Sequence, residues 1–389
     1  MNIASLPFNA DNMLAGLEPW VLCESPTYDA AAVNRMMDLA TKSLLELGAS
    51  IERIPGQKGL GDSVRATFPH PQRDKPGVLI AGHLDTVHPL GTLQQLPFKR
   101  EANKAWGPGI QDMKSGNYLS LEAIRQLQSN SIQTPLPLTV LFTPDEEIGT
   151  PIARELIEAT AKNNRYVLVP EPATQNNGVT WGRYAIARFN LETKGIPVHA
   201  GVDPRLGQSA IKAMARKLIE IEDLASDDCT FSVGTIHGGQ WVNCVASSCT
   251  AQALSMAKKQ ADLDTGVAKI LALNGPAETN SEVTFHVERG VTRPVWEPDD
   301  ACKALFTHTK KLAADIGFNI EPQMSGGGSD GNFTGAMGIP TIDSLGAIGA
   351  GLHTLNEHIE IDSLASRGKL MAALLATLDE STLNNQHHN

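Results

Sequence analysis

Short apolar segments that end in polar residues constrain the fold of this chain more than any other feature. They span residues 77–81, 136–142, 166–169 and 338–342. Helical spacing of apolar residues is clearest at residues 28–49 and 113–127. Strands buried on both faces are apolar throughout, and their alternation with helices is typical of a parallel sheet covered on both sides. We therefore predict an α/β domain with a mainly parallel sheet and helices on both faces.

The middle of the chain has a different pattern. Strands with alternating apolar residues are indicated at 187–193, 230–235, 250–257 and 283–287, and amphipathic helices at 209–224 and 263–273. In chain order these elements make a βαββαβ unit, which is a ferredoxin-like α+β arrangement. A helix at about 301–314 resumes the α/β pattern. We expect an α/β domain of residues 1–181 and 289–389, interrupted by an inserted domain of residues 182–288.

Charge and cysteine content exclude several classes of protein. The 389 residues carry 32 Lys and Arg against 43 Asp and Glu, a net charge of -11. This balance argues against nucleic-acid partners and anionic membranes, and no apolar run approaches the roughly 18 residues of a spanning helix. The five cysteines are odd in number and have no C-x-x-C spacing, and the N-terminus has no signal-peptide pattern. We expect a cytoplasmic protein with neither disulfides nor membrane contact.

Polar residues whose side chains can bind metal ions or act in catalysis follow the predicted buried strands or lie in neighbouring glycine-rich loops. Because ligands collect beyond the carboxyl ends of parallel strands, we expect these side chains to meet at one edge of the sheet. They are His83, Asp85, Asp112, Glu146, Glu147, Glu171 and His353.

Five carboxylates in one place need positive charge, because like charges raise one another's pKa. A pair of divalent cations would supply that charge, and ligands of the His, Asp and Glu types suit zinc. Each residue alone has an ordinary interpretation, such as Asp112 as a helix N-cap. Their combined placement favours a metal site.

The motifs that carry these residues resemble the di-zinc aminoacylase/carboxypeptidase metallopeptidase family. They are GHLDTV at 82–87, GPGIQDMKSG at 107–116, PDEEIG at 144–149 and the late His353. The bacterial glutamate carboxypeptidase branch is the most similar, through PEPAT at 170–174, HAG at 199–201 and GGGSD at 326–330. The inserted domain resembles the family's dimerisation lid. The resemblance also implies a cis peptide bond between Asp112 and Met113.

The resemblance implies two zinc ions per subunit, with Co²⁺ or Mn²⁺ as alternatives. His83, Asp112 and Glu171 would hold one ion. Asp112, Glu147 and His353 would hold the other, so that Asp112 bridges the two. The α/β domain would then be the zinc-dependent catalytic domain.

The resemblance also implies catalytic roles. Glu146 would be the general base, taking a proton from the metal-bridging water and passing it to the leaving amine. Asp85 would orient the His83 imidazole. His199 on the lid would reach the partner subunit's active site and stabilise the oxyanion, which implies a homodimer.

The substrate implied is a small peptide or an N-acyl amino acid. In this family a Glu at position 171 goes with carboxypeptidases and acylases, which favours an amide bond next to a free amino-acid carboxylate. Asn243 and the loop with Gly328 and Ser329 would contact that carboxylate.

One position departs from the branch's pattern. Met256 stands where an Arg would clamp the substrate carboxylate, and Lys258, one pleat further along the strand, would be the substitute cation. An N-acyl-amino-acid deacylase or a dipeptidase is therefore the alternative to a glutamate carboxypeptidase-like enzyme. A catalytically inactive relative that only binds a ligand is the alternative from another functional class.

Overall fold

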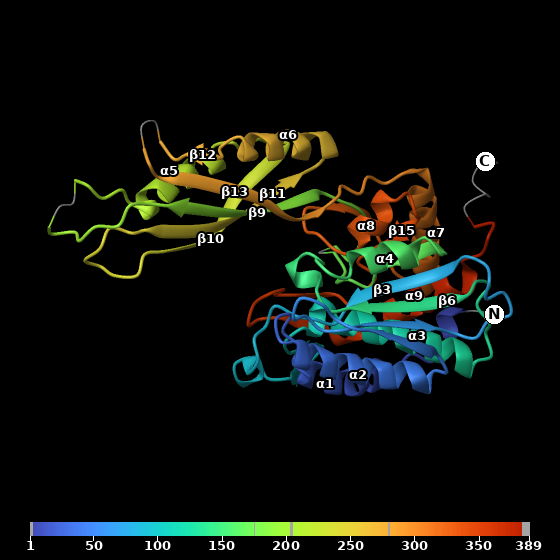
Figure 1. The fold of residues 1–389 in the computed structure, drawn as a ribbon. Helices are drawn as coiled ribbons and strands as arrows, with labels where there is room; N and C mark the ends of the chain where they lie inside the picture. The colour runs from blue at the N-terminus through green and yellow to red at the C-terminus, as the bar shows by residue number, and fades with distance from the viewer. Residues whose placement is uncertain (1–2, 175, 203–204, 279–280, 383–389) are drawn as a thin grey trace. The chain divides into compact units, whose positions relative to one another are not determined.

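The computed structural model describes residues 3–174, 176–202, 205–278 and 281–382 (Figure 1). The chain divides into two compact units. The first consists of Met1–Gly182, Glu297–Ser325 and Ser329–Asn389, and the second of Arg183–Trp296 with Gly326–Gly328.

The first unit is built on a six-stranded sheet in the order β1-β2-β6-β3-β7-β15. Its strands are β1 (Ser50–Ile54), β2 (Ser63–Thr67), β3 (Gly77–His83), β6 (Leu138–Thr143), β7 (Asn164–Leu168) and β15 (Thr341–Ile342). The four strands from β6 to β15 are parallel to one another, β2 pairs antiparallel with β6, and β1 pairs antiparallel with β2. The predicted mainly parallel sheet is confirmed, and the antiparallel pair at its edge is an addition to that prediction.

Helices cover both faces of this sheet (Figure 1). In β3, Val78 and Ile80 pack into one apolar cluster, and Leu79 and Ala81 pack into another on the opposite face. The first cluster is completed by α1 (Ala10–Leu22), α2 (Ala30–Glu46), α3 (Ser115–Ser129), α7 (Asp300–Ile316) and α9 (Ile361–Thr377). The second is completed by α4 (Arg154–Ala161) and α8 (Gly331–Ala336). Burial on both faces explains why the β3 sequence is apolar throughout.

Two smaller sheets complete the first unit. One has the order β16-β17-β5-β4 and consists of β4 (Lys99–Glu101), β5 (Lys104–Trp106), β16 (Gly349–Ala350) and β17 (His358–Glu360). The other pairs β8 (Val179–Arg183) with β14 (Pro322–Ser325). Because β5 pairs with β17, the loop that follows Trp106 lies beside the segment that precedes His358.

The second unit has the predicted βαββαβ order. Its elements are β9 (Ala185–Lys194), α5 (Ala210–Glu222), β10 (Cys229–Gly238), β11 (Ser248–Ala257), α6 (Gln260–Leu271), the short β12 (Gly275–Pro276) and β13 (Thr284–Arg293). The antiparallel sheet has the order β10-β11-β9-β13-β12, and α5 and α6 pack on one of its faces. Strand β13 continues past residue 288, and the buried Trp296 pairs with Arg183, so this unit extends further than residues 182–288.

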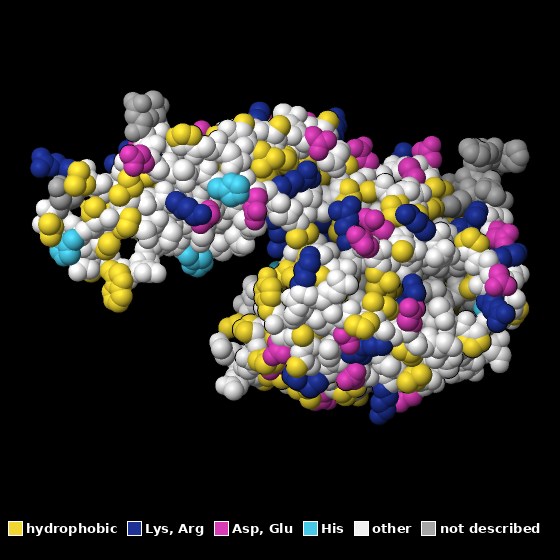
Figure 2. All heavy atoms as spheres, viewed as in Figure 1, with side chains coloured by type: hydrophobic (Ala, Val, Ile, Leu, Met, Phe, Trp, Pro, Cys, Tyr) yellow, Lys and Arg dark blue, Asp and Glu magenta, His cyan; other side chains and the backbone are white. Residues whose placement is uncertain are grey.

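The surface carries charges of both signs. Acidic and basic side chains are interspersed over the viewed face of each unit (Figure 2). In the described residues no helix has the length and apolar character needed to cross a membrane. All five cysteines are free thiols.

Helix α1 offers a matched test of the core. Leu17 is 0% exposed and Leu22 is 49% exposed, and both lie in this helix. Leu17→Ala should lower the free energy of unfolding by about 2–5 kcal/mol, because it removes buried methyl groups and leaves a cavity. Leu22→Ala should change it by less than about 1 kcal/mol. Urea denaturation followed by circular dichroism measures both, and equal midpoints for the two variants would contradict the packing described.

Candidate active site

The seven polar residues predicted to meet at the sheet edge all belong to the first unit. His83 is the last residue of β3 and is buried. Glu146 and Glu147 begin the short turn after β6, and Glu171 follows β7. Asp112 lies in a distorted turn, Ile110–Lys114, and its peptide bond to Met113 is cis, as the family resemblance implies.

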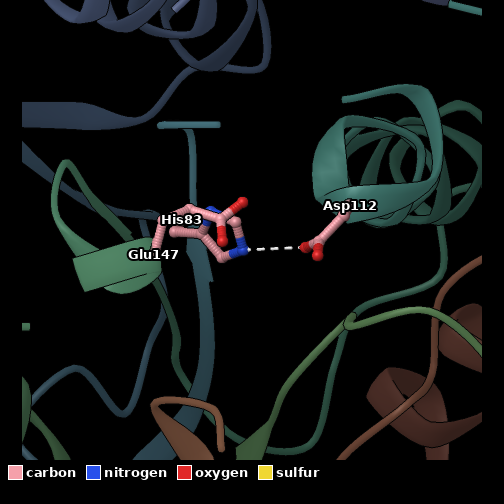
Figure 3. A group of neighbouring side chains, drawn as sticks. All are labelled: His83, Asp112 and Glu147. Atoms are coloured by element: carbon pink, nitrogen blue, oxygen red, sulfur yellow. Dashed lines mark hydrogen bonds and ion pairs between the residues drawn. The ribbon is translucent and has the colours of Figure 1, made fainter. Parts of the chain in front are cut away.

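Asp112 lies between two imidazoles. Its Oδ1 is 3.1 Å from Nε2 of His83, and its Oδ2 is 3.1 Å from Nε2 of His353. Figure 3 shows the first of these contacts, with Glu147 beside His83. Each oxygen of one carboxylate therefore faces a different imidazole, which is the arrangement expected of a group that bridges two cations.

A further carboxylate completes each half of the site. Oε1 of Glu171 is 3.7 Å from Nε2 of His83, and Oε2 of Glu147 is 3.2 Å from Nε2 of His353. Ligand atoms around a tetrahedral zinc, with bonds of 2.0–2.1 Å, lie about 3.3 Å apart. The spacing and the chemistry of these donors fit metal ions.

The shifted pKa values of the site residues also favour metal binding. Burial raises the pKa of Glu171 well above its ordinary value, and burial with the nearby charge of Asp112 raises the pKa of Glu147 to about 8. Hydrogen bonds to Asp112 and Glu147 raise the pKa of His353 to about 10. Burial opposes ionisation of Asp112, but hydrogen bonds from His353 and His83 outweigh it and hold its pKa below the ordinary range. The cluster therefore favours added positive charge, as protons or as metal ions.

Asp85 has more contacts than the sequence predicts. Its carboxylate accepts hydrogen bonds from the backbone N–H groups of Glu146 (3.2 Å) and Glu147 (3.3 Å) and from the hydroxyl of Thr27 (2.7 Å). The nearest partner of His83 Nδ1 is the main-chain oxygen of Asp85 at 3.0 Å, and the carboxylate oxygen is 3.4 Å away. Asp85 thus supports both the imidazole and the turn that carries the two glutamates.

Glu146 is 9% exposed and belongs to the same cluster. Its carboxylate can join His83 and Glu171 in a group whose ligand atoms all lie within 4.8 Å of one another. A second such group consists of His83, Asp112 and Glu147.

The structure brings His199 and Asn243 together within the second unit. They are far apart in sequence, yet His199 forms a backbone bridge with Cys244, and the N–H of Ala200 donates to the carbonyl of Asn243 at 2.9 Å. Both side chains are exposed.

Ser329, predicted to contact the substrate, has its donors engaged inside the protein. Ser329 is buried, its backbone N–H donates to Oδ1 of Asn332 at 3.0 Å, and its hydroxyl donates to Asp343. Both donors are already used inside the protein. Gly328 is closely packed, since a Cβ there would lie 2.6 Å from Cδ of Arg293.

Lys258 lies one residue beyond the end of β11 and is exposed. The pleat of the strand therefore does not fix its direction relative to Met256.

Two buried residues at the site escaped the sequence analysis. Glu357 follows His353 by four residues, and His88 follows the GHLDTV motif. Their side chains contact each other, and Glu357 also contacts the loop of Asp112. The only signal in the sequence is their proximity to recognised motifs.

The family described as peptidase family M20/M25/M40 matches residues 79–377. The chain belongs to this family. It is therefore a metallohydrolase that acts on peptide or amide bonds, and M20 enzymes typically depend on metal ions.

Among M20 relatives, carboxypeptidase G2 of Pseudomonas sp. (strain RS-16) is 29% identical over 372 residues, which are 93% of this chain and 88% of that protein. Succinyl-diaminopimelate desuccinylase of Hydrogenovibrio crunogenus is 25% identical over 355 residues, which are 85% of this chain and 90% of that protein. The solved structure of aminopeptidase PepT from Bacillus cereus has a TM-score of 0.73 at 24% identity and covers 95% of this chain and 98% of its own. The crystal structure of human carnosine dipeptidase 1 also has a TM-score of 0.73, at 16% identity, and the match covers 95% of this chain and 97% of that one. The M20 fold is thus shared by enzymes with different substrates.

Metal binding should release protons and should strengthen as pH rises. Without metal, Glu147 and His353 hold protons near neutral pH, because their pKa values are raised to about 8 and about 10, and burial raises the pKa of Glu171 as well. Metal ligands must be deprotonated, so the apparent affinity for Zn²⁺ should increase from about pH 6 to pH 8. Titration calorimetry in buffers of different ionisation enthalpy measures the proton release. An affinity independent of pH, with no proton release, would contradict this electrostatic description.

Proposed function

We propose that this protein is a di-zinc carboxypeptidase that cleaves an amide bond next to a free amino-acid carboxylate. The observation that carries the proposal is Asp112, whose two oxygens each face an imidazole at 3.1 Å. In this proposal His83, Asp112 and Glu171 hold one ion, and Asp112, Glu147 and His353 hold the other. Such ions, when bound, polarise the scissile carbonyl and lower the pKa of water.

Glu146 is the proposed general base. It takes a proton from the attacking water and delivers it to the leaving amine. Its near-complete burial and its place among the donor atoms of His83 and Glu171 support this role. The hydrogen bond from its backbone N–H to Asp85 holds the turn from which it projects.

The second unit is proposed to act as a lid and dimerisation domain that supplies His199 and Asn243 to a partner subunit. The backbone N–H of Gly201 donates to Nδ1 of His199 at 3.1 Å. The neutral ring therefore carries its proton on Nε2, where it can donate to an oxyanion. Strand β10 pairs only with β11 among the described strands, so it offers an edge for pairing with a second copy.

The proposed substrate is a small peptide or an N-acyl amino acid. Glu171 and the similarity to carboxypeptidase G2 support a carboxypeptidase. Met256 argues against strict glutamate specificity, and the second candidate is an N-acyl-amino-acid deacylase or a dipeptidase. It lies in β11 opposite Ile186 and Thr230, and it cannot form an ion pair with a carboxylate. The five free thiols support the proposed cytoplasmic location.

A hydrolysis screen of the zinc-loaded protein separates these candidates. Substrates with a free carboxylate next to the scissile amide should be cleaved, and their α-amides should be cleaved at least about tenfold more slowly, because they lose a charge-assisted contact. Dipeptides, N-acyl amino acids and glutamyl conjugates are compared in the same assay. Equal rates for each acid and its amide would contradict carboxylate recognition.

Glu146→Gln should abolish turnover while zinc binding remains, because the amide cannot accept the proton but preserves the shape of the side chain. His199→Ala should also lose most activity. If sites are shared across a dimer, an equal mixture of the two variants should recover about a quarter of the wild-type activity, because half the dimers are mixed and each has one intact site.

The complementation needs refolding or co-expression to mix the subunits. Each variant at the same total concentration is the control. A mixture no more active than either variant alone would contradict a shared site, and a fully active Glu146→Gln variant would contradict the base assignment.

A further inference from the structure

Glu357 is a buried carboxylate surrounded by donors. Its side chain is 1% exposed. Oε1 accepts hydrogen bonds from the backbone N–H groups of Gln111 (2.8 Å) and Asp112 (3.0 Å). Oε2 accepts one from the N–H of Gly109 (3.0 Å) and one from Nε2 of His88 (2.6 Å). Four donors from two separate segments therefore converge on one side chain.

These four contacts fill the accepting capacity of Glu357. An ionised carboxylate has about four lone-pair sites, and it has no proton to donate. His88 must therefore carry its proton on Nε2. Glu357 has no capacity left for a metal ion or a substrate, so its influence on the site must act through the loop that it binds.

The loop of Asp112 needs such an anchor. Gly109 has a positive φ of 69°, and Asp112 and Met113 depart from helical backbone angles inside the turn of residues 110–114. An α-helix that began here would leave its first N–H groups without backbone acceptors. A buried N–H without an acceptor is destabilising, and Glu357 supplies the acceptor for three of them.

Glu357 also belongs to the segment that carries His353. Its N–H donates to the carbonyl of Thr354 at 3.3 Å, and the N–H of Thr354 donates to the carbonyl of Gly351 at 3.0 Å. Its own carbonyl accepts the N–H of Gly107 at 3.4 Å. One residue thus connects the loop of Asp112 to the turn of His353 through both its side chain and its backbone.

We propose that Glu357 is a positioning residue that sets the separation of Asp112 and His353, and through it the affinity for the metal ion between them. The inference rests on the proposed two-metal function. Side chains that hold metal ligands in place typically change metal affinity by 10–100-fold when they are replaced.

Glu357→Gln tests the proposal with little change in shape. The amide replaces one carboxylate oxygen by a donor, which then faces a backbone N–H or His88. We expect about 10–100-fold weaker binding of one of the two zinc ions, measured by competition with a chromophoric chelator. Glu360→Gln is the matched control, because it makes the same chemical change three residues away at an exposed position, and it should bind both ions as the wild type does.

Two further measurements separate positioning from general stability. Metal-free Glu357→Gln should melt below the metal-free wild type, because the amide leaves one buried donor without an acceptor, and saturating zinc should restore kcat with KM little changed. His88→Ala removes only one of the four donors and should weaken zinc binding in the same direction by about tenfold or less. It provides the test if Glu357→Gln does not fold.

Unchanged affinity for both ions in Glu357→Gln would overturn the inference, as would a loss of kcat that saturating zinc does not restore. These results differ from failure of the proposed function. In that case the wild-type protein itself would bind fewer than two zinc ions.

Discussion

The site depends on one carboxylate held between two imidazoles. Asp112 can face His83 and His353 at 3.1 Å only if a strand end, a distorted turn and a late loop converge at one point. Burial and the charge of Asp112 raise the pKa of Glu171 and Glu147, so the negative charge of the site has to be balanced by protons or metal ions. The chemistry available to the protein follows from this concentration of negative charge in a buried place.

The fold supplies that convergence through its central parallel strands. Strands β3, β6 and β7 are parallel and buried on both faces, so their carboxyl ends are fixed by packing from two apolar clusters. The remaining ligands come from loops. These loops are held by the pairing of β5 with β17 and by the buried carboxylates of Asp85 and Glu357, each of which accepts backbone N–H groups.

The residues proposed to govern substrate choice lie in a different part of the chain. The residues proposed to contact the substrate beyond the metals, His199 and Asn243, lie in the inserted unit. Met256 also lies there, at the position where an arginine is expected. This division is consistent with the M20 family, in which one fold serves carboxypeptidases, desuccinylases and dipeptidases.

The sequence by itself determined the α/β class, the inserted βαββαβ unit and the seven polar residues of the site, because buried strands and their ends leave a local pattern. It did not indicate α1, which contains Pro19, or α9, whose apolar residues surround the helix and leave no clear face. It also assigned Ser329 to substrate binding, whereas its donors are used by Asn332 and Asp343. The family resemblance implied that Asp112 bridges two ions, but only the tertiary structure placed its oxygens 3.1 Å from both imidazoles and surrounded Glu357 with donors. Except for the contact of Asp112 with His83, those contacts join residues more than 200 positions apart, and several of their donors are backbone N–H groups, which every residue except proline has and which therefore leave no trace in a sequence.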